Sequence, residues 1–474
     1  MLHSIKFLLF PQNKYIFKEV MVLALPVIIS NFSRVFMHIT DTAMVGLLGK
    51  NSLVAVAMSG MMVWIAISIG IGLRISAQSV VSRRLGEDRL DQCGVAMRNS
   101  QIMCFFIAFP VSLLGYYFSD YIVPLVVTDP EVIPLCINYF SLVSLSVYFS
   151  TASFVFQGFY TGIEKTKVLM YVTISSNLIN VYFNAALIYG SENINIFFDS
   201  LNIGFLKYLW IWYEFPQLGI KGAAYATLLS SFIMFAFYFI YLFNKEIRDT
   251  YKVFNSKIDF AMMKRQFSIG YPQSISEVLL NLSFLMFYTI MGIIGTVQLA
   301  ATQVVFAVAH ASFLPAVGVG QACSTLVGKY LGKDDVEKAT QSIYEGLRGA
   351  FIFMGGMGIV FILFPQYLIP LFTSDIEVIK VGISVLRFLG LLQFIDAIAI
   401  TLWFALAGAG DTRFTAIMGV VASWGIFVPL SYLLGITLKF GIWGPWLAFS
   451  AYLIFEVIVI IFRFNQGKWK HIKV

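Results

Sequence analysis

The sequence predicts an all-α integral membrane protein in which twelve transmembrane helices form two parallel-repeat six-helix bundles around a central cleft. The first observation is composition: the 474 residues are 59% hydrophobic and only 12% charged, whereas a soluble domain carries about 25% charged residues. The second is the recurrence of apolar stretches near the roughly 20 residues that cross a bilayer as a helix. The third is that the second half of the chain repeats the first.

The apolar stretches define the expected spans. Several are longer than a bilayer requires, which indicates tilt or extension beyond the membrane. The twelve predicted ranges are 18–45, 53–80, 97–119, 136–161, 168–190, 222–243, 268–294, 299–328, 349–371, 383–407, 414–436 and 443–463.

The positions of Lys and Arg orient these spans. Seven segments that would share one side of the membrane hold 24 of the 32 basic residues, the alternate loops hold five, and the spans hold three. Basic loops stay in the cytoplasm, so we expect both termini to be cytoplasmic. The net charge of +7 is explained by this orientation, and we expect no nucleic-acid partner.

A shift of 246 residues aligns the two halves without a gap from about residue 26 to residue 190. Pro26 then meets Pro272, and Asp129 meets Asp375. Self-similarity at a fixed offset indicates a repeated structural unit. Because each half holds six spans, an even number, both halves begin on the same side, and the repeats are parallel rather than inverted.

This repeat divides the chain into five expected regions. A cytoplasmic amphipathic lead-in precedes an N-terminal six-helix bundle, a basic cytoplasmic linker joins it to a C-terminal six-helix bundle, and a cytoplasmic tail follows. The predicted boundaries are 1–17, 18–243, 244–265, 266–463 and 464–474.

Ionisable residues inside spans are costly and therefore mark functional sites. In the first half, Arg34, His38 and Asp41 follow i, i+4, i+7 spacing and share one face of a helix. Asn180 and Asn184 likewise share a face of the fifth span. Asp41 could carry a proton or, with amide oxygens nearby, bind Na⁺. The alternative is that Asp41 only pairs with Arg34 to hold helices together. We take Arg34 and His38 as modulators of this site.

In the second half, Glu277 on span 7 and Asp396 on span 10 are the candidate carboxylate pair, and together they could form a Na⁺ site. The repeat supports specialised roles, because the scaffold is duplicated while these groups are not: Asp41 aligns with Phe287, and Asp396 aligns with Ser150.

Enzymatic motifs are absent from the sequence. There is no HExxH, no Walker-type Gly-Lys-Thr and no Ser–His–Asp set, and the chain has only four His and four Cys. We therefore expect neither an enzyme nor a cofactor, and the only ion required is a coupling ion, H⁺ or Na⁺.

Several segments resemble the multidrug and toxic compound extrusion (MATE) family, in particular its NorM/DinF-like members within the multidrug/oligosaccharidyl-lipid/polysaccharide exporter superfamily. The resemblance covers residues 18–463 and includes Asp41, Asp396, Asn180 and Asn184 within the motifs TDTAMVGLLG (40–49), LINVYFNAALIYG (178–190), LPAVGVGQACSTLVGKYLG (314–332), QFIDA (393–397) and GAGDTRFT (408–415). It implies a monomeric secondary active multidrug exporter of a bacterial inner membrane. Such a protein antiports organic cations against H⁺ or Na⁺ by alternating access.

Two positions depart from this family pattern. Leu280 stands where NorM-like members place a seventh-span Glu, one turn after Glu277. Arg34 stands where the family usually has an uncharged polar residue, and a fixed positive charge there disfavours a cationic substrate. A zwitterionic or anionic substrate therefore stays open. So does the alternative that the chain is a lipid or lipid-linked oligosaccharide flippase of the same superfamily.

Overall fold

The computed structural model describes residues 11–200, 208, 213–472 and 474, and within these residues it contains helices and no strand. Ten helices are long and apolar enough to cross a membrane, and the pair α6/α7 forms an eleventh span. The twelfth is α8 (Thr166–Ser200), which leaves helical geometry at Gly190 (φ 76°). The prediction of twelve spans is confirmed.

The first six spans form the N-terminal bundle. They are α2 (Lys14–Gly46), α3 (Lys50–Gly86), α4 (Leu90–Tyr117), α6 (Ile133–Ser144) with α7 (Ser146–Gly162), α8, and α9 (Ile220–Tyr241), with the short α5 (Ser119–Val126) before α6 and α10 (Lys245–Tyr251) after α9.

The last six spans form the C-terminal bundle. Two of them include π-helical segments. The elements are α11 (Phe260–Ile294), α12 (Thr296–Gly332), α13 (Val336–Ala350) with η2 (Phe351–Gly355) and α14 (Gly356–Leu363), α15 (Pro365–Leu368) with η3 (Ile369–Leu371), α16 (Ile376–Gly408), α17 (Thr412–Val420) with η4 (Val421–Phe427), α18 (Val428–Tyr432) and η5 (Leu433–Thr437), α19 (Trp443–Asn465), and η6 (Lys468–His471).

The backbone reproduces the 246-residue repeat. Helices α3 and α12 each have 37 residues, and their first residues are 246 positions apart. The left-handed turn residues after them, Asp88 (φ 59°) and Asp334 (φ 56°), are also 246 apart. The repeat is therefore one of conformation as well as sequence.

The fourth span differs from its prediction as a single helix over 136–161, because α6 and α7 meet at an angle of 41°. Two serines flank the break. Ser144 donates to the carbonyl oxygen of Phe140 (2.7 Å), and Ser146 donates to that of Val143 (2.6 Å). Such back-bonding to the preceding turn bends helices. Ser112 of α4 then donates to the carbonyl oxygen of Ser144 (2.6 Å) at the bend.

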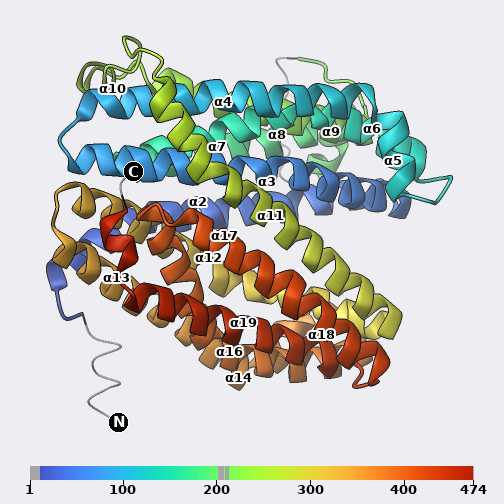
Figure 1. Ribbon diagram of the computed structural model, residues 1–474. Coiled ribbons are helices and arrows are strands. Elements are labelled where there is room, and N and C mark those ends of the chain that lie inside the picture. The colour runs from blue at the N-terminus through green and yellow to red at the C-terminus, as the bar shows by residue number, and fades with distance from the viewer. Residues whose placement is uncertain (1–10, 201–207, 209–212, 473) are drawn as a thin grey trace.

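Both bundles converge at one end, which we call the basic end: it holds α10, the α3–α4 turn and the α12–α13 turn (Figure 1, left). There, Gln78 Nε2 donates to the carbonyl oxygen of Gln321 (2.8 Å) and to Thr325 (2.9 Å). Gly86 and Gly332, equivalent in the repeat, touch each other, and a Cβ on either would overlap the backbone of the other bundle. This contact requires glycine at both positions.

Farther from the basic end, the hydrogen bonds between bundles stop. In the described part of the chain, the bond of Trp64 Nε1 to Asn281 Oδ1 (3.2 Å) is the one farthest from that end. Beyond it the two bundles diverge toward the end that carries α5 and α18 (Figure 1). We expect the predicted central cleft between these diverging halves.

The first helix of each bundle crosses into the other bundle near the basic end. Ile16, Val20 and Leu23 of α2 lie in one core with residues of α12, α13 and α16. Conversely, Met262 and Ile269 of α11 lie in the core of the N-terminal bundle. Figure 1 shows α11 running diagonally from one bundle to the other. Each core is therefore completed by a helix from the opposite half of the sequence.

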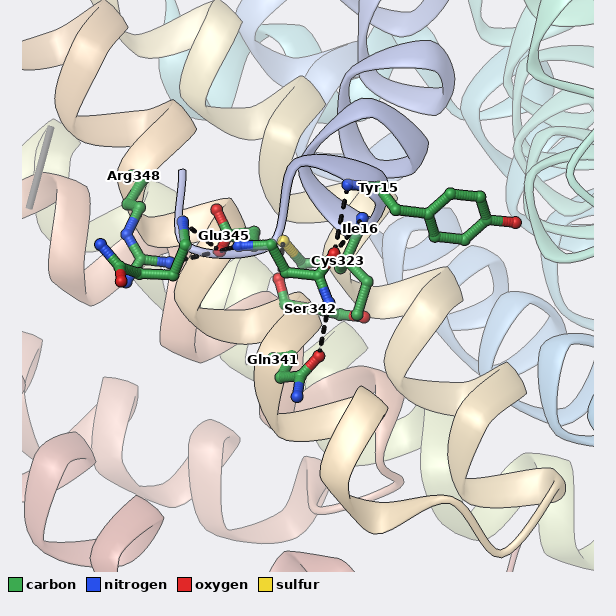
Figure 2. A network of polar contacts seen from close by, with 9 residues as sticks. Tyr15, Ile16, Cys323, Gln341, Ser342, Glu345 and Arg348 are labelled. Carbon is green, nitrogen blue, oxygen red and sulfur yellow. Dashed lines mark hydrogen bonds and ion pairs between the residues drawn. The ribbon is translucent and has the colours of Figure 1, made fainter. Parts of the chain in front are cut away.

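Polar contacts fasten the start of α2 to the C-terminal bundle (Figure 2). The Asn13 side chain accepts from the backbone N–H groups of Tyr15 (3.1 Å) and Ile16 (3.2 Å) and so caps α2. The backbone N–H of Asn13 donates to the buried Glu345 carboxylate of α13 (2.8 Å), which also pairs with Arg348 (2.5 Å). Helix α2 begins at Lys14, four residues before the predicted span. The expected amphipathic lead-in falls largely on residues 1–10, outside the described part.

The end of the chain links both bundles at the same place. Trp469 is fully buried in the core of the C-terminal bundle and stacks on Phe464. The carbonyl oxygen of Ile472 accepts from Arg83 Nη2 of α3 (2.6 Å), and Val474 packs in the core of the N-terminal bundle. The division of the chain into five regions stays a prediction. The first helix of each half and the C-terminal tail contact both bundles.

Candidate functional site

The polar centre of the N-terminal bundle is built around Asp41. Its Oδ1 accepts a hydrogen bond from Asn184 Nδ2 (2.5 Å), and the same Nδ2 donates to Asn180 Oδ1 (3.0 Å). Asn180 Nδ2 in turn donates to Ser230 Oγ of α9 (3.1 Å). Both asparagines are buried. The structure thus brings together three of the five residues that the sequence singled out in this bundle.

Helices α2 and α8 are aligned by polar contacts on both sides of Asp41. Asn177 donates to Ser33 Oγ (2.9 Å), and the Tyr189 hydroxyl donates to the carbonyl oxygen of Met44 (2.6 Å). Because α2 and α8 run in the same direction, these contacts fix the register that places Asn184 opposite Asp41. The i, i+4 spacing then puts Asn180 one turn away.

One acceptor at this centre is unused. Asn184 Oδ1 is buried and has no hydrogen-bond partner within the described residues. A buried amide oxygen without a donor is costly. Together with the Asp41 carboxylate, this oxygen offers two acceptors to a cation or to a proton held on the carboxyl group.

Arg34 and His38 lie apart from this centre. The Arg34 guanidinium lies over the ring of Phe154 of α7, 5.9 Å from its centroid. No ion pair joins Arg34 to Asp41 in the described structure, so the alternative that Asp41 serves only to pair with Arg34 has no support. His38 is exposed and interacts electrostatically with Arg34 and with His310 of α12.

The sequence analysis missed one neighbour of Asp41. Tyr139 of α6 is buried and interacts electrostatically with Asp41. Its counterpart in the repeat is Val385. The same comparison that singled out Asp41, a polar residue facing an apolar counterpart, would have found Tyr139.

In the C-terminal bundle, Glu277 of α11 and Asp396 of α16 are both partly buried. The structure does not join them by a hydrogen bond within the described residues. Instead, Asp396 interacts electrostatically with Glu456 of α19, and Glu456 interacts with Tyr452 one turn before it on the same helix. Tyr452 interacts electrostatically with all three carboxyl groups. The candidate pair is therefore part of a larger acidic cluster: Glu277, Asp396 and Glu456 with Tyr452.

Glu456 was missed because the constant-offset comparison ended at residue 190, before the sixth span of the first half. Its position inside an apolar span was the available signal. Among the residues that the structure describes, no three His, Cys, Asp or Glu side chains come close enough to hold a metal ion. A Na⁺ site at Glu277 and Asp396 would thus need backbone or hydroxyl oxygens as further ligands.

An apolar hollow of about 690 Å³ lies among α4, α7, α8 and α9. Its lining is mostly aromatic and aliphatic and contains none of the ionisable or amide residues named in this subsection; besides Ser112 it includes Phe109, Tyr148, Phe149, Phe183, Tyr225 and Phe232. It therefore offers shape and apolar surface but no carboxyl group for ion coupling.

Comparisons with known proteins agree with this architecture. The MatE family model matches residues 26–186 and again 272–433, two segments whose starts are 246 positions apart, as the internal repeat requires. The probable multidrug resistance protein NorM of Thermotoga maritima is 26% identical over 455 residues, covering 96% of this chain and 93% of the relative. The multidrug resistance protein NorM of Burkholderia vietnamiensis is 24% identical over 449 residues, covering 94% and 92%.

Two solved structures show the same fold. One is the outward-facing conformation of a multidrug resistance MATE family transporter of the MOP superfamily (TM-score 0.83, 19% identity, 99% of each chain). The other is a MOP superfamily transporter from Pyrococcus furiosus, described as having a binding pocket of reverse polarity that suggests a different function (TM-score 0.80, 20% identity, 98% of this chain and 97% of that one).

Proposed function

Because the chain belongs to the MatE family, a family of transporters, we propose that it is a secondary active multidrug exporter rather than an enzyme. In this proposal it moves organic compounds, chiefly cations, out of the cell by alternating access and exchanges them for H⁺ or Na⁺. It acts as a monomer in a bacterial inner membrane, surrounded by lipid, with the basic end and both termini in the cytoplasm.

The observation that carries this proposal is the centre formed by Asp41 and Asn184. A single carboxyl group lies inside a span beside a buried amide oxygen that lacks a donor. In alternating access, the site opens first to one side of the membrane and then to the other. The carboxyl group would then bind the ion or proton on one side and release it on the other. Inward movement of one charge supplies about 2.3 kcal/mol per 100 mV of membrane potential. Binding shifts the bundles only by the difference in affinity between the two states.

The acidic cluster of the C-terminal bundle is the second coupling site in this proposal. Glu277 and Asp396 would bind the ion there, with Asp396 sharing its surroundings with Glu456. Asn180 and Asn184 would act in the first site by orienting Asp41. Arg34 and His38 would modulate the charge of the cleft.

The test is efflux of a fluorescent organic cation from proteoliposomes with imposed H⁺ and Na⁺ gradients applied separately. We expect export under one gradient, and its loss in Asp41→Asn or Asp396→Asn. The matched control is Asp120→Asn, which removes an exposed carboxylate outside the spans. Unchanged ion dependence in both site variants would refute the assignment.

A second candidate function is export of a lipid or lipid-linked oligosaccharide. Two arginines inside the N-terminal bundle, Arg34 and Arg74, favour it, because such substrates carry phosphate groups. Fold alone does not decide between the two substrate classes. Transport of a labelled lipid, rather than a soluble cation, in the same proteoliposomes would support this candidate.

A further inference from the structure

Two arginines in the spans of the N-terminal bundle have no acidic partner. Arg34 of α2 and Arg74 of α3 interact electrostatically with each other. Neither forms an ion pair with any residue that the structure describes. A positive charge inside a membrane is costly, by about 2.5–3.5 kcal/mol or more, and two neighbouring positive charges add repulsion. A bound anion would offset both costs.

The surroundings of Arg74 leave donors unused. In the amide orientation of Gln321 that satisfies both side chains, its oxygen accepts from Arg74 Nη1 (3.0 Å) and Nη2 (3.2 Å). Gln321 belongs to α12, so this contact crosses between the bundles. Arg74 Nε is buried and has no partner in the described structure. A neutral amide therefore orients the guanidinium without neutralising it.

The nearby carboxyl groups do not provide the missing charge. Asp41 lies two turns from Arg34 on α2, about 10 Å along the axis, and is engaged by Asn184. Glu277 of α11 interacts electrostatically with Arg74, but the two are too far apart to form an ion pair. No carboxylate of the described chain therefore neutralises either guanidinium group through an ion pair.

The two arginines belong to one bundle only. In the repeat, Arg34 aligns with Leu280 and Arg74 aligns with Gly320. A residue that the duplicated scaffold requires would more often recur at the equivalent position of the other half, 246 residues away. The ring of Phe154 beneath Arg34 adds an apolar face beside the positive charge.

We propose that Arg34 and Arg74 form an anion-binding subsite in the cleft that accepts the carboxylate or phosphate group of an amphipathic, aromatic or acyl-bearing molecule. Guanidinium groups bind such oxyanions through paired, charge-assisted hydrogen bonds. The inference rests on the proposed transport function only in treating the bound molecule as cargo. Zwitterions fit best, because their cationic part would face Glu277 while their anionic part binds the arginines.

The experiment measures binding to the purified full-length chain in lipid nanodiscs without any ion gradient. Dansylglycine, with one aromatic ring system and one free carboxylate, is the anionic probe, and dansylcadaverine is its cationic counterpart. In nanodiscs of zwitterionic lipid, we expect Arg34→Gln and Arg74→Gln each to weaken dansylglycine binding by about tenfold. Dansylcadaverine binding should stay within about twofold.

Two further variants separate charge from structure. Arg387→Gln removes an exposed arginine of α16 in the other bundle and should leave both probes unchanged. Arg34→Lys keeps the charge and should recover part of the lost affinity. The proposal is overturned if the wild-type chain does not bind dansylglycine, if Arg34→Gln and Arg74→Gln bind it normally, or if they lose both probes equally.

A second arm identifies the source of the anion. Addition of phosphatidylglycerol to the nanodiscs should abolish dansylglycine binding if a lipid phosphate is the natural ligand, and should leave it intact if the ligand is a soluble organic acid. Either result supports the subsite. Because the assay needs no gradient, intact anion binding together with failed cation efflux would reject the antiport proposal and keep this one.

Discussion

The two bundles share a backbone but hold their membrane carboxyl groups in different surroundings. In the N-terminal bundle, Asp41 is fixed by a chain of amides and a hydroxyl that leads through Asn184 and Asn180 to Ser230. In the C-terminal bundle, Glu277, Asp396 and Glu456 all interact electrostatically with Tyr452. One site is preorganised by neutral donors, whereas the other concentrates acidic groups.

The helices around these sites also differ between the two bundles. The third and fifth spans of the C-terminal bundle contain the π-helical segments η2, η4 and η5. Their counterparts α4 and α8 are α-helical up to Gly190. Segments of π-helix are frequent at functional sites. The comparison teaches that duplication preserved topology and turns, while each copy acquired its own polar chemistry and its own irregularities.

The largest effect should come from Asp41→Asn. This change removes the only carboxyl group of its site and leaves the amides without an anion to orient. We expect gradient-driven efflux to fall about 100-fold, equivalent to roughly 2.7 kcal/mol, measured as initial rate in proteoliposomes. If the efflux rate fell less in Asp41→Asn than in Asp396→Asn, the C-terminal bundle rather than the N-terminal bundle would hold the more important coupling site.

Asn184→Ala should rank next. It removes the Nδ2 donor to Asp41 and the Oδ1 acceptor that has no partner in the described structure, but the Asp41 carboxyl group remains. We expect about a tenfold loss of efflux rate, because a hydrogen bond to a charged group contributes roughly 1.5–3 kcal/mol. The control is Asn193→Ala, which removes an exposed asparagine of the same helix that bonds only to the backbone of its own turn. Equal losses in the two variants would deny Asn184 a specific role.

Glu456→Gln should have a smaller effect, because two other carboxyl groups remain in its cluster. We expect about a threefold change in the concentration of coupling ion that half-saturates transport, or roughly 0.6 kcal/mol. In a double-mutant cycle with Asp396→Asn, the effects should be non-additive, as for residues in contact. Strict additivity would place Glu456 outside the site.

The smallest effects on transport, and equal ones, are expected from Gly86→Ala and Gly332→Ala. These positions are equivalent in the repeat, and a Cβ on either meets the backbone of the other bundle. Overpacking of this kind costs about 1–3 kcal/mol, so thermal unfolding midpoints should fall by similar amounts. Gly46→Ala is the control, because nothing lies within 4 Å of its added Cβ. Unequal shifts would show that the scaffold itself is asymmetric.

Much of the fold could be predicted because it depends on patterns that a single sequence carries. Span number follows from hydropathy, and the repeat follows from self-comparison. The partnership of Asp41 with Asn184 could be inferred in part, because both are polar residues in apolar spans and both lie in motifs that resemble the MATE family.

Other features could not be predicted because they depend on which surfaces meet. Helix α2 is apolar on most of its faces, so its sequence does not tell which core receives Ile16 and Val20. The bend at Leu145 depends on serine side chains turning back to the preceding carbonyls rather than on a Pro or Gly signal. The neighbourhood of Asp396 and Glu456 joins a span that the repeat comparison covered to α19, which it did not reach.

The first helix of each half, α2 or α11, packs in the core of the opposite bundle, and this arrangement has a consequence for synthesis and membrane insertion. During synthesis, the N-terminal half emerges first, but Ile16, Val20 and Leu23 pack in a core that also requires Ala316, Ile343 and Leu402. The core of the N-terminal bundle in turn includes Met262 and Ile269 of α11, from the second half. Neither half can therefore mature on its own in the insertion machinery. Co-expressed halves, split within the segment before α11, would have to reassemble as a pair before either gained protease resistance.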